Sequence, residues 1–330
     1  MQTWLRLWML ASLCALTGCA ILPDVNVTPR EHLYIADKGN HRIVRLDDMD
    51  GKGWATLGGE KGTEAGQLDS PQSVYVDGSE HIYIADTGNS RIVRTDDMAG
   101  KNWTNLGRKG DGNAQFTLPT GIYVDRENRI YVADRNNDRV TRMEDMNATH
   151  WVAFGAHGKA ANQFTGPTGI YVDSNEKIYI TDSISVVNGM LNNRLVRIDD
   201  MDGANWRSLS EMPGNQVGAF NNPSGICMGA KGRIYVADTF NNRILRMDSI
   251  EGKNWVALGG SAGGNPGQFN QPTGVFVEVL PDGAEHIYIA DSLNNRIVRV
   301  DDMTGKNWVS FGTAGSSQGQ FDTPTGIFAR

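Results

Sequence analysis

Short apolar runs rich in Ile, Val and Tyr follow one another from about residue 30 onward, and Gly, Asn and Asp separate them. Runs of this kind, bounded by turn residues, are typical of β-strands joined by hairpins. The segment from 121 to 155 predicts four strands, over Gly121–Asp125, Arg129–Asp134, Arg139–Asp145 and Trp151–Gly155. These strands are apolar on both faces, which indicates a small sheet packed between two neighbours.

The same four-strand segment recurs with a period of roughly 50 residues. An aspartate ends the second strand of each copy, at Asp37, Asp86, Asp134, Asp182, Asp238 and Asp291. An arginine follows at Arg42, Arg91, Arg139, Arg194, Arg243 and Arg296. A tryptophan recurs at Trp54, Trp103, Trp151, Trp206, Trp255 and Trp308, and a proline at Pro71, Pro119, Pro167, Pro223, Pro272 and Pro324. These copies predict an all-β fold, a six-bladed β-propeller of four-stranded blades.

The two ends of the repeat region complement each other. The first run, from His32 to Asp37, corresponds to the second strand of a copy, and the last, from Pro324 to Arg330, corresponds to a first strand. Pairing of these strands would complete one blade and leave no open sheet edge. We therefore expect a ring closed by pairing of the N- and C-terminal strands.

The first residues have the features of a bacterial export signal. Arg6 precedes an apolar run that is too short to span a bilayer. The sequence Leu-Thr-Gly-Cys that ends at Cys19 resembles the lipobox, in which the cysteine becomes the lipid-bearing N-terminus. The alternative is an ordinary signal peptide that contains a cysteine. We predict a signal peptide over 1–18, a lipidated Cys19 with a tether over 19–30, and the propeller over 31–330.

This prediction places the protein in the cell envelope, with the lipid anchor as its contact with the membrane. Ala20 after the cysteine favours the outer membrane, facing the periplasm, if the cell is Gram-negative. The formal net charge is −7, and a mildly acidic domain does not attract phosphate backbones, so nucleic acid is excluded as a partner. After cleavage and lipidation Cys227 is the one remaining thiol, so we expect no disulfide.

The run Pro-Thr-Gly-Ile-Tyr-Val-Asp that starts at Pro119, followed by Ile-Tyr-Val-Ala-Asp, resembles the NHL repeat, as does Asn-x-Arg-Ile in other copies. The resemblance covers residues 31–330. It implies a propeller whose proline–glycine strand is innermost and lines the channel. It leaves the function open, because this fold hosts lyases, lactonase-like enzymes, sensor domains and adaptor or RNA-binding surfaces.

Most repeated polar residues have a structural interpretation, because a residue needed once for chemistry does not recur in every blade. We expect each Asp and Asn to satisfy backbone groups of the turn between the second and third strands, and each Arg to pair with an acid. The tryptophans should fill space between blades. The acidic pairs before Met-x-Gly, such as Asp47 and Asp48, indicate a solvated rim rather than calcium sites.

Strand direction sorts the loops onto two faces. The Pro-x-Gly starts of the inner strands and the loops after the strand-ending aspartates share one face, called the top here, and the Met-x-Gly turns lie on the bottom. Inner-strand ends converge at the mouth of the channel, where we expect a ligand. The predicted polar ring there consists of Gln72, Thr120, Thr168, Ser224, Thr273 and Thr325, with Lys38 and Arg135 adding positive charge.

The sequence offers no metal site at this mouth. Enzymes of similar fold, such as the streptogramin B lyases, place histidine at some Pro-x-Gly positions, whereas no such position carries histidine here. A zinc site needs several imidazoles to converge. We therefore expect no catalytic residues and no cofactor.

One insertion breaks the repeat and points to function, because such insertions often carry binding. The top loop between Asp182 and Arg194 is longer than its counterparts. Its apolar residues, which we name as candidate ligand contacts, are Ile184, Val187, Met190 and Leu191. The alternative is a drifted loop that folds onto its own blade.

Two functions stay open after this reasoning. The first is a non-catalytic, envelope-anchored binding or scaffold propeller that recognises an envelope protein, a peptide or a glycan at its top face. The alternative is a metal-dependent lyase or lactonase-like enzyme, and only that alternative calls for a divalent metal. The scarcity of histidine favours the first.

Overall fold

The computed structural model describes residues 32–183, 192–210 and 214–330. The predicted signal peptide, Cys19 and the tether lie outside the described residues, as do Ile184, Val187, Met190 and Leu191. Residues 31 to 330 form one compact unit. Within the described part of this unit, no helix is long and apolar enough to cross a membrane.

Six antiparallel sheets of four strands make up this unit. In spatial order from the inner strand outward, blade 1 contains β26 (Pro324–Ala329), β1 (Leu33–Asp37), β2 (Arg42–Leu46) and β3 (Ala55–Gly58). Blade 2 contains β4 (Ser73–Val76), β5 (Ile82–Asp86), β6 (Arg91–Thr95) and β7 (Thr104–Leu106). Blade 3 contains β8 (Pro119–Val124), β9 (Ile130–Asp134), β10 (Arg139–Met143) and β11 (Val152–Phe154).

The other three blades repeat this plan. Blade 4 contains β12 (Pro167–Val172), β13 (Ile178–Ser183), β14 (Asn193–Ile198) and β15 (Arg207–Leu209). Blade 5 contains β16 (Pro223–Met228), β17 (Ile234–Asp238), β18 (Arg243–Met247) and β19 (Val256–Gly259). Blade 6 contains β20 (Pro272–Val279), β21 (Glu285–Asp291), β22 (Arg296–Val300) and β23 (Val309–Phe311). A short parallel pair, β24 (Thr313–Ala314) and β25 (Gln320–Phe321), follows blade 6.

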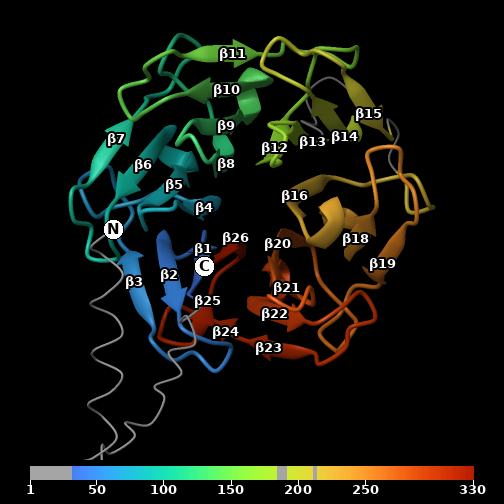
Figure 1. Cartoon of the computed structure of the whole chain (residues 1–330). Helices are drawn as coiled ribbons and strands as arrows, with labels where there is room; N and C mark the ends of the chain where they lie inside the picture. Colours follow the sequence, from blue (N-terminus) through green and yellow to red (C-terminus); the bar gives the residue numbers. More distant parts are fainter. Residues whose placement is uncertain (1–31, 184–191, 211–213) are drawn as a thin grey trace, which may run out of the picture. The chain divides into compact units, whose positions relative to one another are not determined.

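The blades stand in a ring (Figure 1), and their inner strands line a central cavity. Each inner strand contacts the inner strands of the two neighbouring blades. The ring closes where β1 pairs antiparallel with β26, with Leu33 opposite Ala329. The predicted six-bladed fold, the four strands per blade and the closure by the two terminal strands are therefore confirmed.

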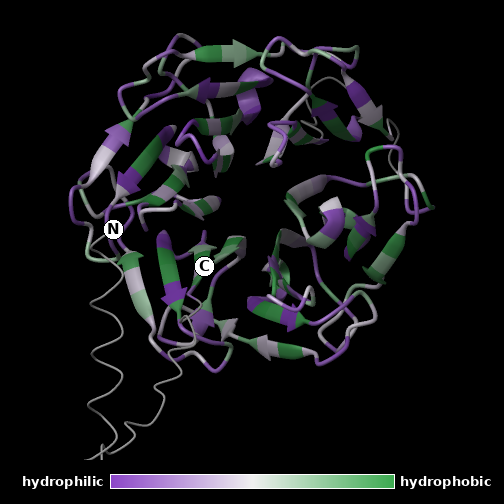
Figure 2. Cartoon of the chain, viewed as in Figure 1, coloured by the Kyte–Doolittle hydropathy of each residue, from purple (hydrophilic) through white to green (hydrophobic). Residues whose placement is uncertain are grey.

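Hydrophobic packing between blades holds the ring together. Hydrophobic residues gather along the strands and hydrophilic ones in the connecting loops (Figure 2). Each core cluster joins two neighbouring blades: Ile43 of blade 1, for instance, packs with Val74 and Ile84 of blade 2. Full burial of one such side chain contributes about 1.5–3 kcal/mol. The recurrent tryptophan extends this packing, since Trp54 of blade 1 contacts Phe311 of blade 6.

The recurrent Asp, Asn and Arg form a buried latch in every blade. In blade 1 the Oδ2 atom of Asp37 accepts hydrogen bonds from Asn40 and from Nε of Arg42, both at 2.8 Å. The guanidinium of Arg42 also donates to the carbonyls of Ser316 and Gln320, in the loop that follows blade 6. Each latch thus ties one blade to the one before it, and the structural interpretation of these residues agrees with the geometry.

The structure corrects one detail of the role that we expected for the recurrent aspartates. The Oδ1 atom of each latch aspartate does not bind the turn that follows its strand. In blade 1 it accepts the backbone N–H of Asp322 at 2.7 Å, two residues before Pro324. The aspartate therefore positions the start of the inner strand, because it fixes the backbone that leads into the channel.

Candidate functional site

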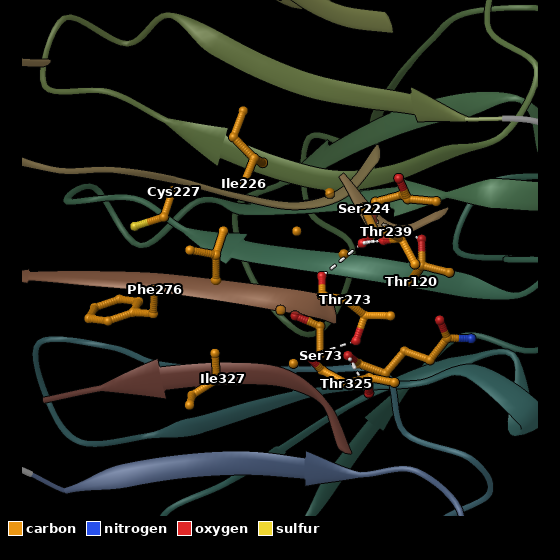
Figure 3. A pocket seen from close by; sticks show the side chains of 18 of the residues that line it. Ser73, Thr120, Ser224, Ile226, Cys227, Thr239, Thr273, Phe276, Thr325 and Ile327 are labelled. Atoms are coloured by element: carbon orange, nitrogen blue, oxygen red, sulfur yellow. Dashed lines mark hydrogen bonds between the residues drawn. The ribbon is translucent and has the colours of Figure 1, made fainter. Parts of the chain in front are cut away.

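A cavity of about 580 Å³ runs along the channel, from the starts of the inner strands to Met228 and Phe328 near their ends. The inner strands line its depth, and the loops after the second strands line its mouth. In Figure 3 Cys227 and Phe276 lie toward one end of this cavity, and Thr120, Ser224, Thr273 and Thr325 lie toward the other. A volume of this size accommodates a small ligand or the end of a longer chain.

The structure brings together the predicted residues that it describes at the mouth. The members of the polar ring, Gln72, Thr120, Thr168, Ser224, Thr273 and Thr325, all line the cavity, and Lys38 and Arg135 line it as well. Their placement follows from the repeat, because each ring member stands between the proline and the glycine or serine that begin an inner strand.

The ring hydroxyls, however, are already used between blades. Hydroxyls of preceding blades cap all six proline carbonyls. The pairs are Thr325 with Pro71, Thr87 with Pro119, Thr120 with Pro167, Thr168 with Pro223, Thr239 with Pro272, and Ser292 with Pro324. The Ser224 hydroxyl lies within hydrogen-bond distance of the Thr239 hydroxyl and of the Thr273 carbonyl in the next blade. The Thr273 hydroxyl likewise lies near the Ser292 hydroxyl and the Thr325 carbonyl.

This arrangement limits what the polar ring can offer a ligand. A hydroxyl has one proton, and once a carbonyl accepts it the oxygen has only lone pairs left to offer. Thr120 and Thr325 are also nearly inaccessible, with 5% and 7% of their surface exposed. We expected the whole ring to hydrogen-bond a ligand. The structure limits this role, because the ring hydroxyls donate their hydrogen bonds between blades and can only accept hydrogen bonds from a ligand.

The glycine of Pro-x-Gly permits this close approach. A Cβ atom on Gly121 would lie 2.5 Å from the carbonyl oxygen of Thr168 in the next blade. One on Gly225 would lie 2.6 Å from the oxygen of Thr273. Inner strands can therefore approach each other this closely only where a side chain is missing. Blade 2 departs from the pattern with Ser73.

Deeper in the channel, aromatic side chains form a girdle, which we define as Tyr75, Tyr123, Tyr171, Phe276 and Phe328. Neighbouring rings lie 4.7–5.0 Å apart between centroids. Burial raises the pKa of Tyr75 to about 12 and raises the pKa of Tyr123 as well. The girdle gives the cavity an apolar inner wall of neutral phenol and phenyl groups.

Cys227 occupies the girdle position of blade 5. It is buried, and its Sγ atom accepts the backbone N–H of Val277 at 3.4 Å. Burial raises the pKa of this thiol to about 12, so the nucleophilic thiolate is absent near neutral pH. Its burial shows that Cys227 packs into the wall of the channel.

The charged side chains that line the cavity are Lys38 and Arg135 alone among the described residues. Burial lowers the pKa of the Arg135 guanidinium, which still stays protonated at neutral pH. No aspartate, glutamate or histidine belongs to the described lining. Nor does any group of three or more His, Cys, Asp or Glu side chains in the described ranges stand close enough to hold a metal ion.

Two apolar residues at the mouth were not anticipated from the sequence. Phe240 and Leu293 line the cavity and expose 50% and 45% of their surface. Each stands two residues after a latch aspartate, where blades 1 and 2 have Gly39 and Gly88. Comparison of this one position across the repeats would have revealed them.

These features define a six-bladed β-propeller with a cavity in its central channel. Three of its repeats are NHL repeats, since the family model described as "NHL repeat" matches residues 68–94, 116–143 and 220–247. Each match covers the first three strands of a blade. No curated protein sequence matches the chain.

Several solved structures share the fold. A propeller in the structure titled "Crystal structure of Nidogen/Laminin Complex" is 18% identical, with a TM-score of 0.66 over 91% of this chain and 98% of that one. Virginiamycin B lyase from Staphylococcus aureus is 14% identical, with a TM-score of 0.57 over 92% and 89% of the two chains. A streptogramin B lyase is 17% identical, with a TM-score of 0.56 over 90% and 83%. At these identities the likeness concerns the fold alone.

Proposed function

We propose that this chain is a non-catalytic binding propeller that recognises a protein, a peptide or a glycan at the top mouth of its channel. Cys19 would anchor it in the cell envelope through lipid, in the outer membrane facing the periplasm if the cell is Gram-negative. Its contact with the membrane would be limited to that anchor.

The composition of the cavity lining carries this proposal. General acid–base catalysis needs a carboxylate or imidazole within reach of the reacting atoms, and a zinc site needs several such ligands. The described lining provides neither group, and its thiol is protonated. What it does provide is a cavity with an apolar wall, a few polar acceptors and two cations, which is the make-up of a recognition site.

The solved structures of similar fold support a binding function, but they do not decide between binding and catalysis. One of them belongs to a structure titled as a nidogen–laminin complex, so a propeller of this kind can take part in a protein complex. The lyases show that the same fold also supports catalysis. No residue of the described lining favours that second function over binding.

Site-specific photo-crosslinking tests the proposal. p-Benzoylphenylalanine replaces Phe240 or Leu293 on the top face in one pair of variants, and Lys101 or Lys253 on the bottom face in the other. The full-length protein is irradiated in living cells. We expect a discrete adduct from both top positions and from neither bottom position. Adducts from the bottom alone would contradict recognition at the channel mouth.

A further inference from the structure

We propose that the channel binds a protein segment that inserts one aromatic side chain at the place where the aromatic girdle lacks a ring. The inserted ring would lie over Cys227, between Tyr171 and Phe276, and the peptide groups beside it would contact Asn222 and Gln271. The proposal rests on the function proposed above, and it names the kind of partner that the same cavity would select.

The aromatic girdle is an incomplete circle. Ring contacts join its five members in a row that begins at Tyr171 and ends at Phe276, with neighbouring centroids 4.7–5.0 Å apart. The sixth position belongs to Cys227 of blade 5, and in the described part of the chain no ring contact joins Tyr171 to Phe276. The circle of rings is therefore open at blade 5.

The cavity reaches deeper at this opening than elsewhere. Among the described residues, its lining in blades 1 to 4 ends at the girdle position. In blades 5 and 6 the lining continues to the next residue, which is Met228 or Val277. Cys227 and Phe276 lie together toward this end of the cavity (Figure 3). The space of the missing ring thus belongs to the cavity and is not filled by neighbouring side chains.

An aromatic ring suits this space in size and in surroundings. An apolar cavity of about 150 Å³ is large enough to hold benzene, and the whole cavity here has about 580 Å³. A ring over Cys227 would have Tyr171 and Phe276 as its two neighbours, and would extend the tilted contacts of 52–58° that join the girdle. Such pairs are more favourable than their buried area alone accounts for. The thioether of Met228 also contacts rings favourably.

The mouth above this opening offers amide groups. Asn222 of blade 5 and Gln271 of blade 6 line the cavity, and their side chains form no hydrogen bond with any described residue. A side-chain amide can donate and accept hydrogen bonds at once, as a peptide group does. These two side chains are therefore available to bind the backbone of a protein segment.

Two apolar residues lie beside these amides. The backbone N–H of Phe240 donates to the carbonyl of the residue before Asn222 at 3.0 Å, and that of Leu293 donates to the carbonyl of the residue before Gln271 at 3.1 Å. The turn that carries Phe240 also contacts blade 6, since Oδ1 of Asn242 accepts the backbone N–H of Gln271 at 2.9 Å. Apolar and amide side chains of two neighbouring blades thus share one side of the mouth, above the opening in the girdle.

This combination favours a peptide over a glycan. The inner wall of the cavity is aliphatic and aromatic, so sugar hydroxyls buried against it would lose their hydrogen bonds to water without replacement, at a cost in free energy. A peptide separates the two kinds of group, because its amides lie in the backbone and its aromatic ring in a side chain. The backbone can stay at the mouth while the ring enters the channel.

Isothermal titration calorimetry with three uncharged tripeptides tests the proposal on the chain from residue 20 to 330. The probes are acetyl-Ala-Phe-Ala-amide, its cyclohexylalanine analogue and its trialanine analogue. None carries a charge, so the cations at the mouth do not select among them. We expect the phenylalanine peptide to bind about tenfold or more tightly than trialanine. We expect it to bind about threefold more tightly than the cyclohexylalanine peptide, because only a flat ring continues the girdle.

Two phenylalanine substitutions place the effect at the opening. C227F fills it with the ring that blade 6 has as Phe276, and we expect the phenylalanine peptide to bind at least about tenfold more weakly. V279F is the matched control, because it adds the same ring to the bottom hairpin, where Val279 is 47% exposed, and it should bind like the parent. Thermal unfolding confirms that both variants are folded.

Two further substitutions test the neighbouring contacts. Y171L removes one ring beside the opening, and it should reduce the preference for phenylalanine over cyclohexylalanine. N222G introduces the glycine that blade 4 has as Gly166, at a position where Asn222 has a φ of 55°. It should weaken all three peptides by similar factors, because the amide at the mouth contacts their common backbone.

The outcomes separate the two proposals. Equal binding of the three peptides, or absence of binding by all three, would overturn the insertion of an aromatic ring. Undiminished binding of the phenylalanine peptide to C227F would overturn it too; if C227F does not fold, an unchanged preference for phenylalanine in Y171L would do so. In each case crosslinks from Phe240 and Leu293 would still support recognition at the mouth. Crosslinks confined to the bottom face would overturn the proposed function itself.

Discussion

The carboxylate of Asp37 accepts the backbone N–H of Asp322 at 2.7 Å, although 285 residues separate them in the chain. This bond joins the first described strand to the loop that leads into the last one. The Asp37 side chain is fully buried and also holds Asn40 and Arg42. Closure of the ring thus depends on a polar contact as well as on the pairing of β1 with β26.

We predict that D37A destabilises the domain by about 3–5 kcal/mol, because it leaves the buried charge of Arg42 without its partner. Urea unfolding followed by tryptophan fluorescence measures the change. D50A is the matched control, since the side chain of Asp50 is 80% exposed and should cost little. Equal stability of D37A and D50A would contradict the role of the latch.

We predict that G121A destabilises the domain by about 1–3 kcal/mol, because the new methyl group meets the Thr168 carbonyl of the next blade. Blade 2 provides the control, since Ser73 already has a Cβ atom at this position, and S73A should change stability far less. Thermal unfolding by circular dichroism compares the two. An unchanged melting temperature of G121A would show that the neighbouring inner strands can move apart without loss of stability.

The Cys227 thiol gives a prediction on reactivity. With a pKa of about 12, only about one thiol in ten thousand is ionised at pH 8. Iodoacetamide should therefore leave the native domain (residues 20–330) unmodified and alkylate it in denaturant, as mass spectrometry would show. Fast alkylation of the native protein at pH 8 would contradict the burial of this residue.

The same group predicts a pH dependence of stability. The unfolded thiol ionises near pH 9 and the folded one near pH 12, so the folded state holds more protons between these values. Its contribution is fully present below pH 9 and is lost as pH rises toward 12. C227A lacks the group, so its free energy of unfolding should fall less steeply than that of the parent over this range. Equal slopes of the free energy of unfolding against pH for C227A and the parent would contradict the raised pKa of the Cys227 thiol.

The fold was predictable because its markers recur. Each latch repeats a local contact, such as that between Asp291 and Arg296 five residues later, and so leaves a periodic trace in the sequence. The position of the polar ring followed from the same periodicity. The use of the ring hydroxyls between blades did not follow from it, because the carbonyls that face the Thr120 hydroxyl belong to Pro167 and Thr168 of the next blade, 47 and 48 residues away.

Only some of the residues at the channel mouth could be predicted from the sequence. Lys38 and Arg135 stood out as charges next to the latch aspartates. Phe240 and Leu293 did not, because single apolar residues in polar loops are common and only the ring places these two at one opening.

The central claim is that the channel binds a ligand without metal-dependent catalysis. Native mass spectrometry of residues 20–330, purified without chelator, tests it most directly. We predict the mass of the bare chain, and a melting temperature that EDTA does not change. One tightly bound divalent ion per chain, with a loss of stability in EDTA, would contradict the claim and restore the lyase or lactonase-like alternative.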